Sequence, residues 1–248
     1  MERESKQVDA VKTSARVIDA LADRGASGVT ELADALETPK STVHVHLSTL
    51  VEQGLVLNEG GTYRLSLRFL EIGGRVRSHT IFDQAKREVD AVADDLNELV
   101  NLMVEEDGMG VYIYSVRGND AVDLDTTPGR HCPLNTTALG KAIMAHMQEE
   151  RVHEIVDRYG LPARTEHTIT DREELLDRLE TIRERGYAYD DEENLRGVSC
   201  VAVPVVVERG VLGALSVSGP VSRMKSTDRI RERLQDAANV IEVNVEYN

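Results

Sequence analysis

Three short helical patterns followed directly by a two-glycine turn restrict most strongly what the first part of this chain can form. Apolar residues recur at helical spacing in residues 12–24 and again in residues 30–37. Pro39 suits the first turn of a third helix, which we expect to run to about Gln53. β-Type side chains then flank Gly60-Gly61, as in a hairpin. This order predicts a winged helix-turn-helix, a fold that places one helix in the major groove of DNA.

The third helix has a core face and an outward face. Val43, Leu47 and Leu50 fall on one side at helical spacing and are expected to pack. On the outward face, hydroxyl groups suit phosphate oxygens, and the apolar Val45 suits the methyl group of thymine. For His44 a solvated side chain remains the alternative. The DNA contacts that we expect on this helix are Lys40, Ser41, Thr42, His44, Val45 and Thr49.

The hairpin supplies two further candidate contacts with the DNA backbone or the minor groove. These are Tyr63 and Arg64, which follow the turn. Glu59 beside the turn argues against deep insertion into a groove, because its charge repels phosphate. An arginine in a hairpin is commonly just solvated, and that alternative stays open for Arg64.

Net charge does not exclude a nucleic-acid partner. The chain carries 29 Lys and Arg against 44 Asp and Glu, a formal net charge of −15. Residues 1–75 contribute only −2 and residues 76–248 contribute −13, and no acid lies between Glu37 and Glu52. Among the basic residues, 6 are Lys and 23 are Arg. A surface rich in carboxylates and poor in lysine is favoured in a high-salt cytoplasm, which leads to the hypothesis of a halophilic source.

Strand patterns dominate after residue 100, and helical patterns separate them. We expect strands at 101–107, 111–118 and 121–127, and a hairpin formed by residues 198–207 and 211–219. Helices are expected at 133–147, 149–159, 171–185 and 227–245. Strands with helices outside them predict an α+β domain. The chain thus divides into a winged helix-turn-helix domain at 8–70, a helical linker at 71–99 and a second domain at 100–248.

Two motifs resemble those of the IclR family of transcriptional regulators. The run PKSTVHVHLSTLVEQGLV, followed by GGTYRLSLRFLEIG, is similar to the DNA-binding half of that family, and a spaced signature appears as Gly186, Asp190, Glu193 and Cys200. With the acidic composition, the chain resembles a haloarchaeal-type member. The resemblance implies a multidomain α+β fold with an N-terminal winged helix-turn-helix and a C-terminal, GAF-like effector-binding domain. This sequence departs from the family at Val45, where many members carry arginine.

Members of that family bind small organic acids in the second domain, and the resemblance implies matching positions at Ala138, Leu139, Asp190, Cys200, Ser216 and Ser218. The residues themselves add support. Ser216 and Ser218 are two apart on a strand, so both hydroxyls face one side, where they need a polar partner. Residues 135–140 open a helix whose free N–H groups attract an anion, although Thr136 and Thr137 are equally ordinary helix caps.

We therefore expect a cytoplasmic regulator, a homodimer or a dimer of dimers, whose binding to a palindromic operator in double-stranded DNA is modulated by a small organic-acid effector. One alternative is a second domain that only oligomerises, and another is a thiol enzyme built on Cys200 and a histidine. Cys200 lies in an apolar strand where a buried thiol is usually inert, and His131-Cys132 lacks the second pair of a zinc site. No catalytic residue, cofactor or metal is expected. No membrane span is expected either, since apolar stretches such as 201–207 are far shorter than the ~20 residues a membrane helix needs.

Overall fold

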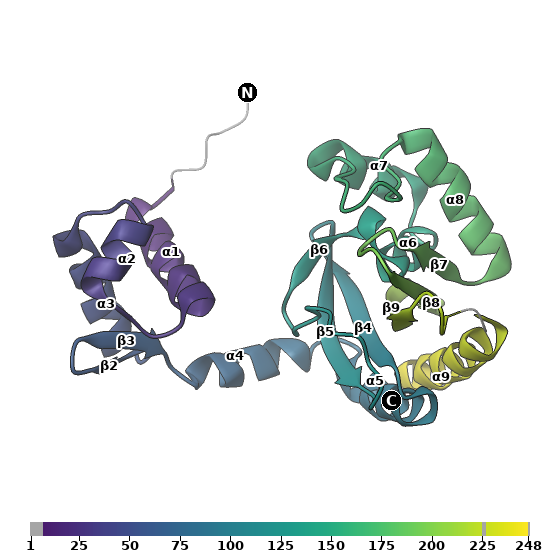
Figure 1. The fold of residues 1–248 in the computed structure, drawn as a ribbon, viewed down its shortest axis with the longest axis horizontal. Helices are drawn as coiled ribbons and strands as arrows, with labels where there is room; N and C mark the ends of the chain where they lie inside the picture. The colour runs from purple at the N-terminus through teal and green to yellow at the C-terminus, as the bar shows by residue number, and fades with distance from the viewer. Residues whose placement is uncertain (1–6, 225–226, 248) are drawn as a thin grey trace. The chain divides into compact units, whose positions relative to one another are not determined.

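The computed structural model of the chain describes residues 7–224 and 227–247, which fold into two compact units (Figure 1). Unit 1 ends at Val76 and unit 2 begins at Arg77. None of the helices in the described ranges is both long enough and apolar enough to cross a membrane.

Unit 1 is the predicted winged helix-turn-helix. Its helices are α1 (Asp9–Arg24), α2 (Val29–Ala35), α3 (Lys40–Glu52) and, after the wing, α4 (Arg68–Arg77). Strands β2 (Val56–Glu59) and β3 (Thr62–Leu65) form the expected hairpin, and a short strand that was not expected, β1 (Ser27–Gly28), pairs with β3 on its other edge. The helices pack around a single core of Val17, Leu21, Leu32, Ala33, Leu36, Val43, Leu47, Leu50, Val56 and Tyr63.

Local chemistry fixes both ends of α3. Pro39 is the N-cap residue, and its carbonyl accepts a hydrogen bond from the N–H of Val43 at 3.1 Å. At the other end, Gly54 adopts φ +70°, a left-handed conformation that glycine takes without strain. The N–H groups of Gly54 and Leu55 bond back to Val51 and Leu50, both at 2.9 Å, which ends the helix and turns the chain into the wing.

Unit 2 is built on one six-stranded antiparallel sheet with the order β6-β5-β4-β9-β8-β7. The strands are β4 (Leu99–Glu106), β5 (Met109–Arg117), β6 (His131–Pro133), β7 (Ala188–Asp191), β8 (Val198–Val207) and β9 (Gly210–Pro220). The helices are α5 (Phe82–Leu96), α6 (Ala138–Met144), α7 (Glu149–Tyr159), α8 (Arg172–Arg185) and α9 (Thr227–Tyr247), with a 3₁₀ turn, η1, at Leu134–Thr136. The predicted hairpin of β8 and β9 is present.

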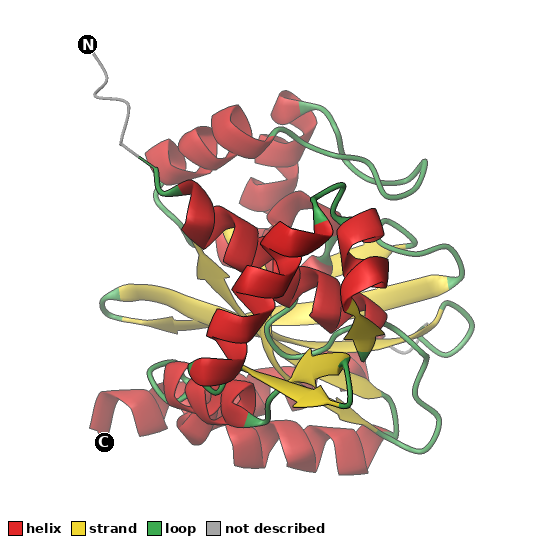
Figure 2. Ribbon diagram, turned by 90° about the vertical axis from the view of Figure 1, so that its left-hand side faces the viewer, coloured by secondary structure: helices red, strands yellow, loops and turns green. Residues whose placement is uncertain are grey.

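Helices cover both faces of this sheet, so unit 2 has two cores (Figure 2). Val201, Val203, Val205, Leu215 and Val217 pack on one face with α5 and α9. The opposite face packs against α6, α7 and α8. Alternate residues of β8 and β9 thus reach different layers, and the layer with α6 contains the cavity described below.

Two expectations about the elements differ from the structure. Residues 121–127 form no strand; they run as an irregular segment, and the edge position beside β5 is taken by β6. Their alternating pattern has another cause, because Leu124 and Thr126 are buried while Asp123 and Asp125 are exposed. The expected linker at 71–99 is also not one element. It contains the end of α4 and the whole of α5. Helix α5 buries Phe82, Val89 and Val92 in the core of unit 2 and therefore belongs to that unit.

Candidate functional site

The outward face of α3 is open to solvent as the sequence predicted. Val43, Leu47 and Leu50 are buried, whereas Val45 is 62% exposed. Of the other candidate contacts, Lys40, Ser41, His44 and Thr49 are exposed and Thr42 is half-buried. The hydroxyl of Thr49 donates to the carbonyl of Val45 at 3.0 Å, so its proton is used within the helix and its oxygen remains an acceptor.

The wing, which is the hairpin of β2 and β3, offers fewer candidate DNA contacts than the sequence predicted. Tyr63 is only 4% exposed and belongs to the core of unit 1, so its expected contact with DNA does not agree with the structure. An alternating strand places successive side chains on opposite faces, and Tyr63 is on the inner one. Arg64 is half-buried and forms an ion pair with Glu59 at 2.6 Å, which partly neutralises the wing.

In unit 2 the structure brings all six candidate effector residues to one cavity. Ala138 and Leu139 lie at the start of α6, Asp190 on β7, Cys200 on β8, and Ser216 and Ser218 on β9. Register explains the gathering: Asp190 pairs with Cys200, and Cys200 pairs with Ser218 on the next strand. Thr137, which the sequence offered as an anion contact or a helix cap, also lines the cavity, and sequence reasoning missed the remaining lining residues, namely Asn101, Tyr112, Leu124, Thr126 and Asn194.

The start of α6 is held by its own hydrogen bonds. Thr137 is the N-cap residue, and its hydroxyl accepts from the N–H of Gly140 at 2.9 Å. Thr136 donates to the carbonyl of Pro133 at 2.8 Å, and the amide of Asn135 donates to the carbonyls of Pro162 and Ile169. For Thr137 the structure therefore has the ordinary cap that the sequence left as an alternative.

Three ionisable side chains are buried beside the cavity. Lys141 forms an ion pair with Glu193, and their side chains are 0% and 5% exposed. Asp190 accepts a hydrogen bond from the N–H of Glu193 at 2.7 Å through Oδ1. Burial raises the pKa of Asp190 to about 6, with Lys141 acting in the opposite direction. A sequence signal could have identified Lys141, because it is the single charged residue in the apolar helix ALGKAIM.

The cavity has very little free space. The space in it that admits the centre of a water molecule measures about 10 Å³, enough for about one water. Two polar atoms on its walls have no hydrogen-bond partner among the described residues, Asp190 Oδ2 and Ser216 Oγ. Cys200 and Ser218 on the same walls are partners of each other, since the thiol of Cys200 donates to Ser218 Oγ at 3.0 Å.

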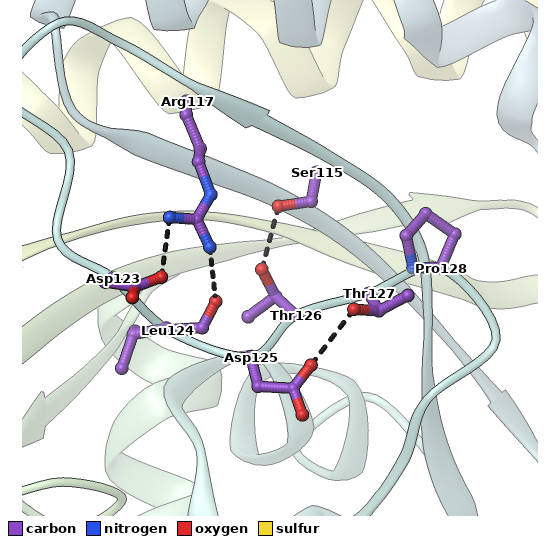
Figure 3. A pocket seen from close by; sticks show the side chains of 8 residues that line it. All are labelled: Ser115, Arg117, Asp123, Leu124, Asp125, Thr126, Thr127 and Pro128. Carbon is purple, nitrogen blue, oxygen red and sulfur yellow. Dashed lines mark hydrogen bonds and ion pairs between the residues drawn. The ribbon is translucent and has the colours of Figure 1, made fainter. Parts of the chain in front are cut away.

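The segment 123–128 borders this region and is tied to β5 by side-chain bonds (Figure 3). Arg117 binds the carboxylate of Asp123 at 2.8 Å and the carbonyl of Leu124 at 2.9 Å. The hydroxyls of Ser115 and Thr126 are 2.8 Å apart. These bonds position Leu124 and Thr126, which lie on the wall of the cavity.

The geometry of the two cysteines is not that of a nucleophile. Burial raises the pKa of the Cys200 thiol well above its usual range, and its hydrogen-bond partner is a serine. Burial also raises the pKa of Cys132, to about 11. Within the described residues no three His, Cys, Asp or Glu side chains gather in a way that would hold a metal ion.

Comparison with known proteins agrees with this architecture. The family model for the "Bacterial transcriptional regulator IclR C-terminal" matches residues 74–243, and that for the "IclR helix-turn-helix domain" matches residues 10–60. The chain is 32% identical to the HTH-type transcriptional regulator KdgR of Escherichia coli, with 98% of this chain and 96% of the relative covered. It is 28% identical to the probable HTH-type transcriptional regulator ArcR of Halobacterium salinarum, with the same coverage.

Among solved structures, that of the IclR protein of Thermotoga maritima matches with a TM-score of 0.82 and 29% identity, and covers 97% of this chain and 100% of that one. The relatives in these comparisons are named as regulators and not as enzymes.

Proposed function

This chain belongs to the IclR family of DNA-binding transcriptional regulators, and we propose that a small organic acid bound in the cavity of unit 2 modulates the binding of α3 to an operator. The observation that carries the proposal is the cavity itself. It is lined by side chains from α6 and from strands β4, β5, β7, β8 and β9, and two of its buried polar atoms lack a partner in the described part of the chain. A buried polar atom without a partner costs free energy, which a ligand recovers by bonding to it.

For DNA, the exposed side of α3 supports the assignment of the contacts. We propose that Lys40, Ser41 and Thr42 lie near phosphates at the start of the helix, and that His44, Val45 and Thr49 face the major groove. The region from Lys40 to Val51 contains no carboxylate, so it presents no like charge to the phosphates although the chain is acidic overall. Arg64 is a weaker candidate, because Glu59 already neutralises it.

We propose that the chain acts as a homodimer, or a dimer of dimers, on a palindromic operator. Exposed apolar side chains support this: Val8 and Val11 at α1 are 62% and 66% exposed, and Leu67 and Leu70 at α4 are 74% and 72% exposed. Exposed apolar side chains that lie together on a surface often mark an interface with another protein chain. A two-fold dimer presents two copies of α3 to two half-sites. The proposed place of action is the cytoplasm, where the operator is.

The effector acts by binding one arrangement of the dimer more tightly than another, which changes the populations of the two. The main alternative is a second domain that only holds the dimer together. The two differ in one respect, since only the first predicts that operator affinity changes when an acid is added. The thiol enzyme is disfavoured by the protonated, buried state of Cys200.

The experiment is a titration of the full chain with the DNA upstream of its own gene, followed by fluorescence anisotropy in molar KCl. A duplex of the same composition in scrambled order is the control. We expect binding at least about a thousandfold tighter to the upstream sequence, the lower end for specific DNA-binding proteins. Equal affinity for both duplexes at every salt concentration contradicts the DNA-binding part of the proposal.

A further inference from the structure

The C-terminal end of α3 lacks a cation of its own. Its last turn contains no basic residue, and its last residue is the acid Glu52. The carbonyls at the end of a helix carry partial negative charge, which a basic side chain stabilises and an acidic one does not. This end of α3 is therefore stabilised by any cationic donor that reaches it from another element.

Arg68, the first residue of α4, supplies that donor. Its guanidinium donates through Nη1 to the carbonyl of Gln53, which is the C-cap residue of α3. A Cβ atom added at Gly54 would lie 3.5 Å from the same Nη1, so the guanidinium lies against the turn that ends α3. A charged donor in this position satisfies a carbonyl and also complements the helix dipole.

Backbone hydrogen bonds hold Arg68 beside that turn. The N–H of Ser66 donates to the carbonyl of Leu55 at 2.9 Å, directly after the turn. The hydroxyl of Ser66 accepts from the N–H of Arg68 at 3.2 Å, at the start of α4. The start of α4 is thus bonded on both sides of Gly54, to Gln53 through the side chain of Arg68 and to Leu55 through Ser66.

The last turn of α3 carries a residue that we assign to the major groove. The carbonyl of Thr49 accepts from the N–H of Gln53 at 2.9 Å, so the bond from Arg68 to Gln53 supports the turn on which Thr49 lies. Lys40, a proposed phosphate contact, lies at the opposite end of the helix. Loosening of the last turn is therefore expected to weaken contacts with bases while it leaves contacts with phosphates in place.

We propose that Arg68 is a positioning residue for operator recognition, which fixes the last turn of α3 to the start of α4 and sets sequence selectivity without touching DNA. The inference rests on the proposed function, because it takes α3 to be the helix that reads the operator. It also gives α4 a role. This helix ends at Arg77, where unit 2 begins, so the segment that joins the two units starts at the residue that holds α3.

A direct contact with phosphate is the competing role for Arg68, since the residue is exposed and a guanidinium has five N–H donors. The two roles differ in their dependence on salt. Loss of a phosphate contact weakens binding to every sequence and reduces the slope of log affinity against log salt by about one. Loss of a positioning bond lowers only the affinity for the operator and leaves that slope unchanged.

The first measurement is the affinity of full-length Arg68→Gln for the upstream duplex and for the scrambled duplex, by fluorescence anisotropy over a series of KCl concentrations. We expect the affinity for the upstream duplex to fall about three- to tenfold. This is the lower range for a hydrogen bond from a charged group, because Arg68 is exposed. The affinity for the scrambled duplex and the salt slope are expected to stay as in the wild type.

Two further variants separate the bond from the charge. Arg68→Lys keeps a cationic donor and is expected to recover most of the lost affinity. Arg75→Gln is the matched control, because it removes the same charge from the same face of α4, two turns further along, where Arg75 pairs with Glu71 at 2.7 Å. The control is expected to bind both duplexes as the wild type does.

The second measurement needs no DNA. Hydrogen exchange, followed by mass spectrometry, reports on the N–H groups of Gln53, Gly54 and Leu55, which close the end of α3. In Arg68→Gln these groups are expected to exchange about three- to tenfold faster than in the wild type, as the same lost bond implies. In Arg75→Gln their exchange is expected to be unchanged.

Four results overturn the inference. They are an unchanged affinity of Arg68→Gln for the upstream duplex, a salt slope reduced by about one, an Arg68→Lys variant that behaves like Arg68→Gln, and equal hydrogen exchange in Arg68→Gln and Arg75→Gln. Failure of the proposed function is distinct, because then the wild type itself binds both duplexes equally. Hydrogen exchange still measures in that case whether Arg68 holds the end of α3.

Discussion

Lys141 and Glu193 form an ion pair inside unit 2, with side chains that are 0% and 5% exposed. The pair joins α6 to the segment after β7, and both elements contribute walls of the cavity. Because the pair neutralises itself, Asp190 is left as the unbalanced charge beside the cavity. One buried interaction thus connects the stability of unit 2 with the chemistry of the proposed effector site.

Lys141→Met is expected to destabilise the chain by about 3–5 kcal/mol, because it leaves the carboxylate of Glu193 buried without a counter-charge. The measurement is chemical denaturation followed by circular dichroism. Arg178→Met is the control: Arg178 is 38% exposed and 3.9 Å from Glu193, so its loss is expected to cost about 0–1 kcal/mol. Equal losses in the free energy of unfolding for the two substitutions would contradict the prediction that the buried ion pair contributes more than the exposed one.

Asp190→Asn is expected to change how stability depends on pH. The folded carboxyl, whose pKa burial raises from 3.8 to about 6, holds more protons than the unfolded one between these values. The contribution of Asp190 to stability therefore falls as pH rises through that window. A difference of about two pKa units corresponds to about 3 kcal/mol. The asparagine variant lacks this loss, so its stability relative to the wild type should increase from pH 4 to pH 7.

Denaturation of both proteins at a series of pH values between 4 and 7 measures that difference. The groups around Asp190 that also carry or gain charge are Lys141, Glu193, Cys200 and Tyr112. Asp191→Asn is the control, since Asp191 is the next residue on β7 but is exposed. A relative stability of the Asp190→Asn variant that stays constant with pH contradicts the prediction.

Lys40→Ala is expected to weaken DNA binding about equally for all sequences and to reduce the slope of log affinity against log salt by about one, as for a single lost phosphate contact. Val45→Ala is expected to act differently, by lowering the preference for the operator over scrambled DNA. Lys86→Ala serves as the control for charge, because Lys86 lies on α5 and pairs with Asp90. An unchanged salt slope for Lys40→Ala argues that this lysine makes no phosphate contact.

The hypothesis of a halophilic source predicts a strong dependence of stability on salt. With a net charge of −15, of which −13 falls in residues 76–248, unit 2 repels itself at low ionic strength. Molar KCl reduces the screening length to about 3 Å and removes most of that repulsion. The midpoint of thermal unfolding is therefore expected to rise sharply from low to molar KCl. A midpoint that does not change with KCl contradicts the hypothesis.

Much of the fold was predictable because its elements follow local rules. The spacing of apolar residues predicted α3, with Pro39 at its start and Gly54 after its end. The turn between β8 and β9 was also predicted from the sequence. The failures are non-local. The segment 121–127 has a strand-like alternation, yet its neighbour in space, β5, already pairs with β6. Burial of Tyr63 depends on which face of the wing meets the helices, which strand propensity does not specify.

The candidate site likewise has features that the sequence predicted and features that depend on how distant segments pack. The six positions implied by the family motif do meet, since the register of β7, β8 and β9 aligns them. The ion pair of Lys141 with Glu193 joins residues far apart in the chain, and its existence depends on how α6 packs on the sheet.

The most direct test of the account is the affinity of the full chain for its own upstream DNA in molar KCl, measured with and without each of a panel of small organic acids. We predict sequence-selective binding that at least one acid weakens or strengthens by about tenfold, a typical coupling between two sites. Selective binding that no acid changes would contradict the account, and would leave unit 2 as a domain that only holds the oligomer together.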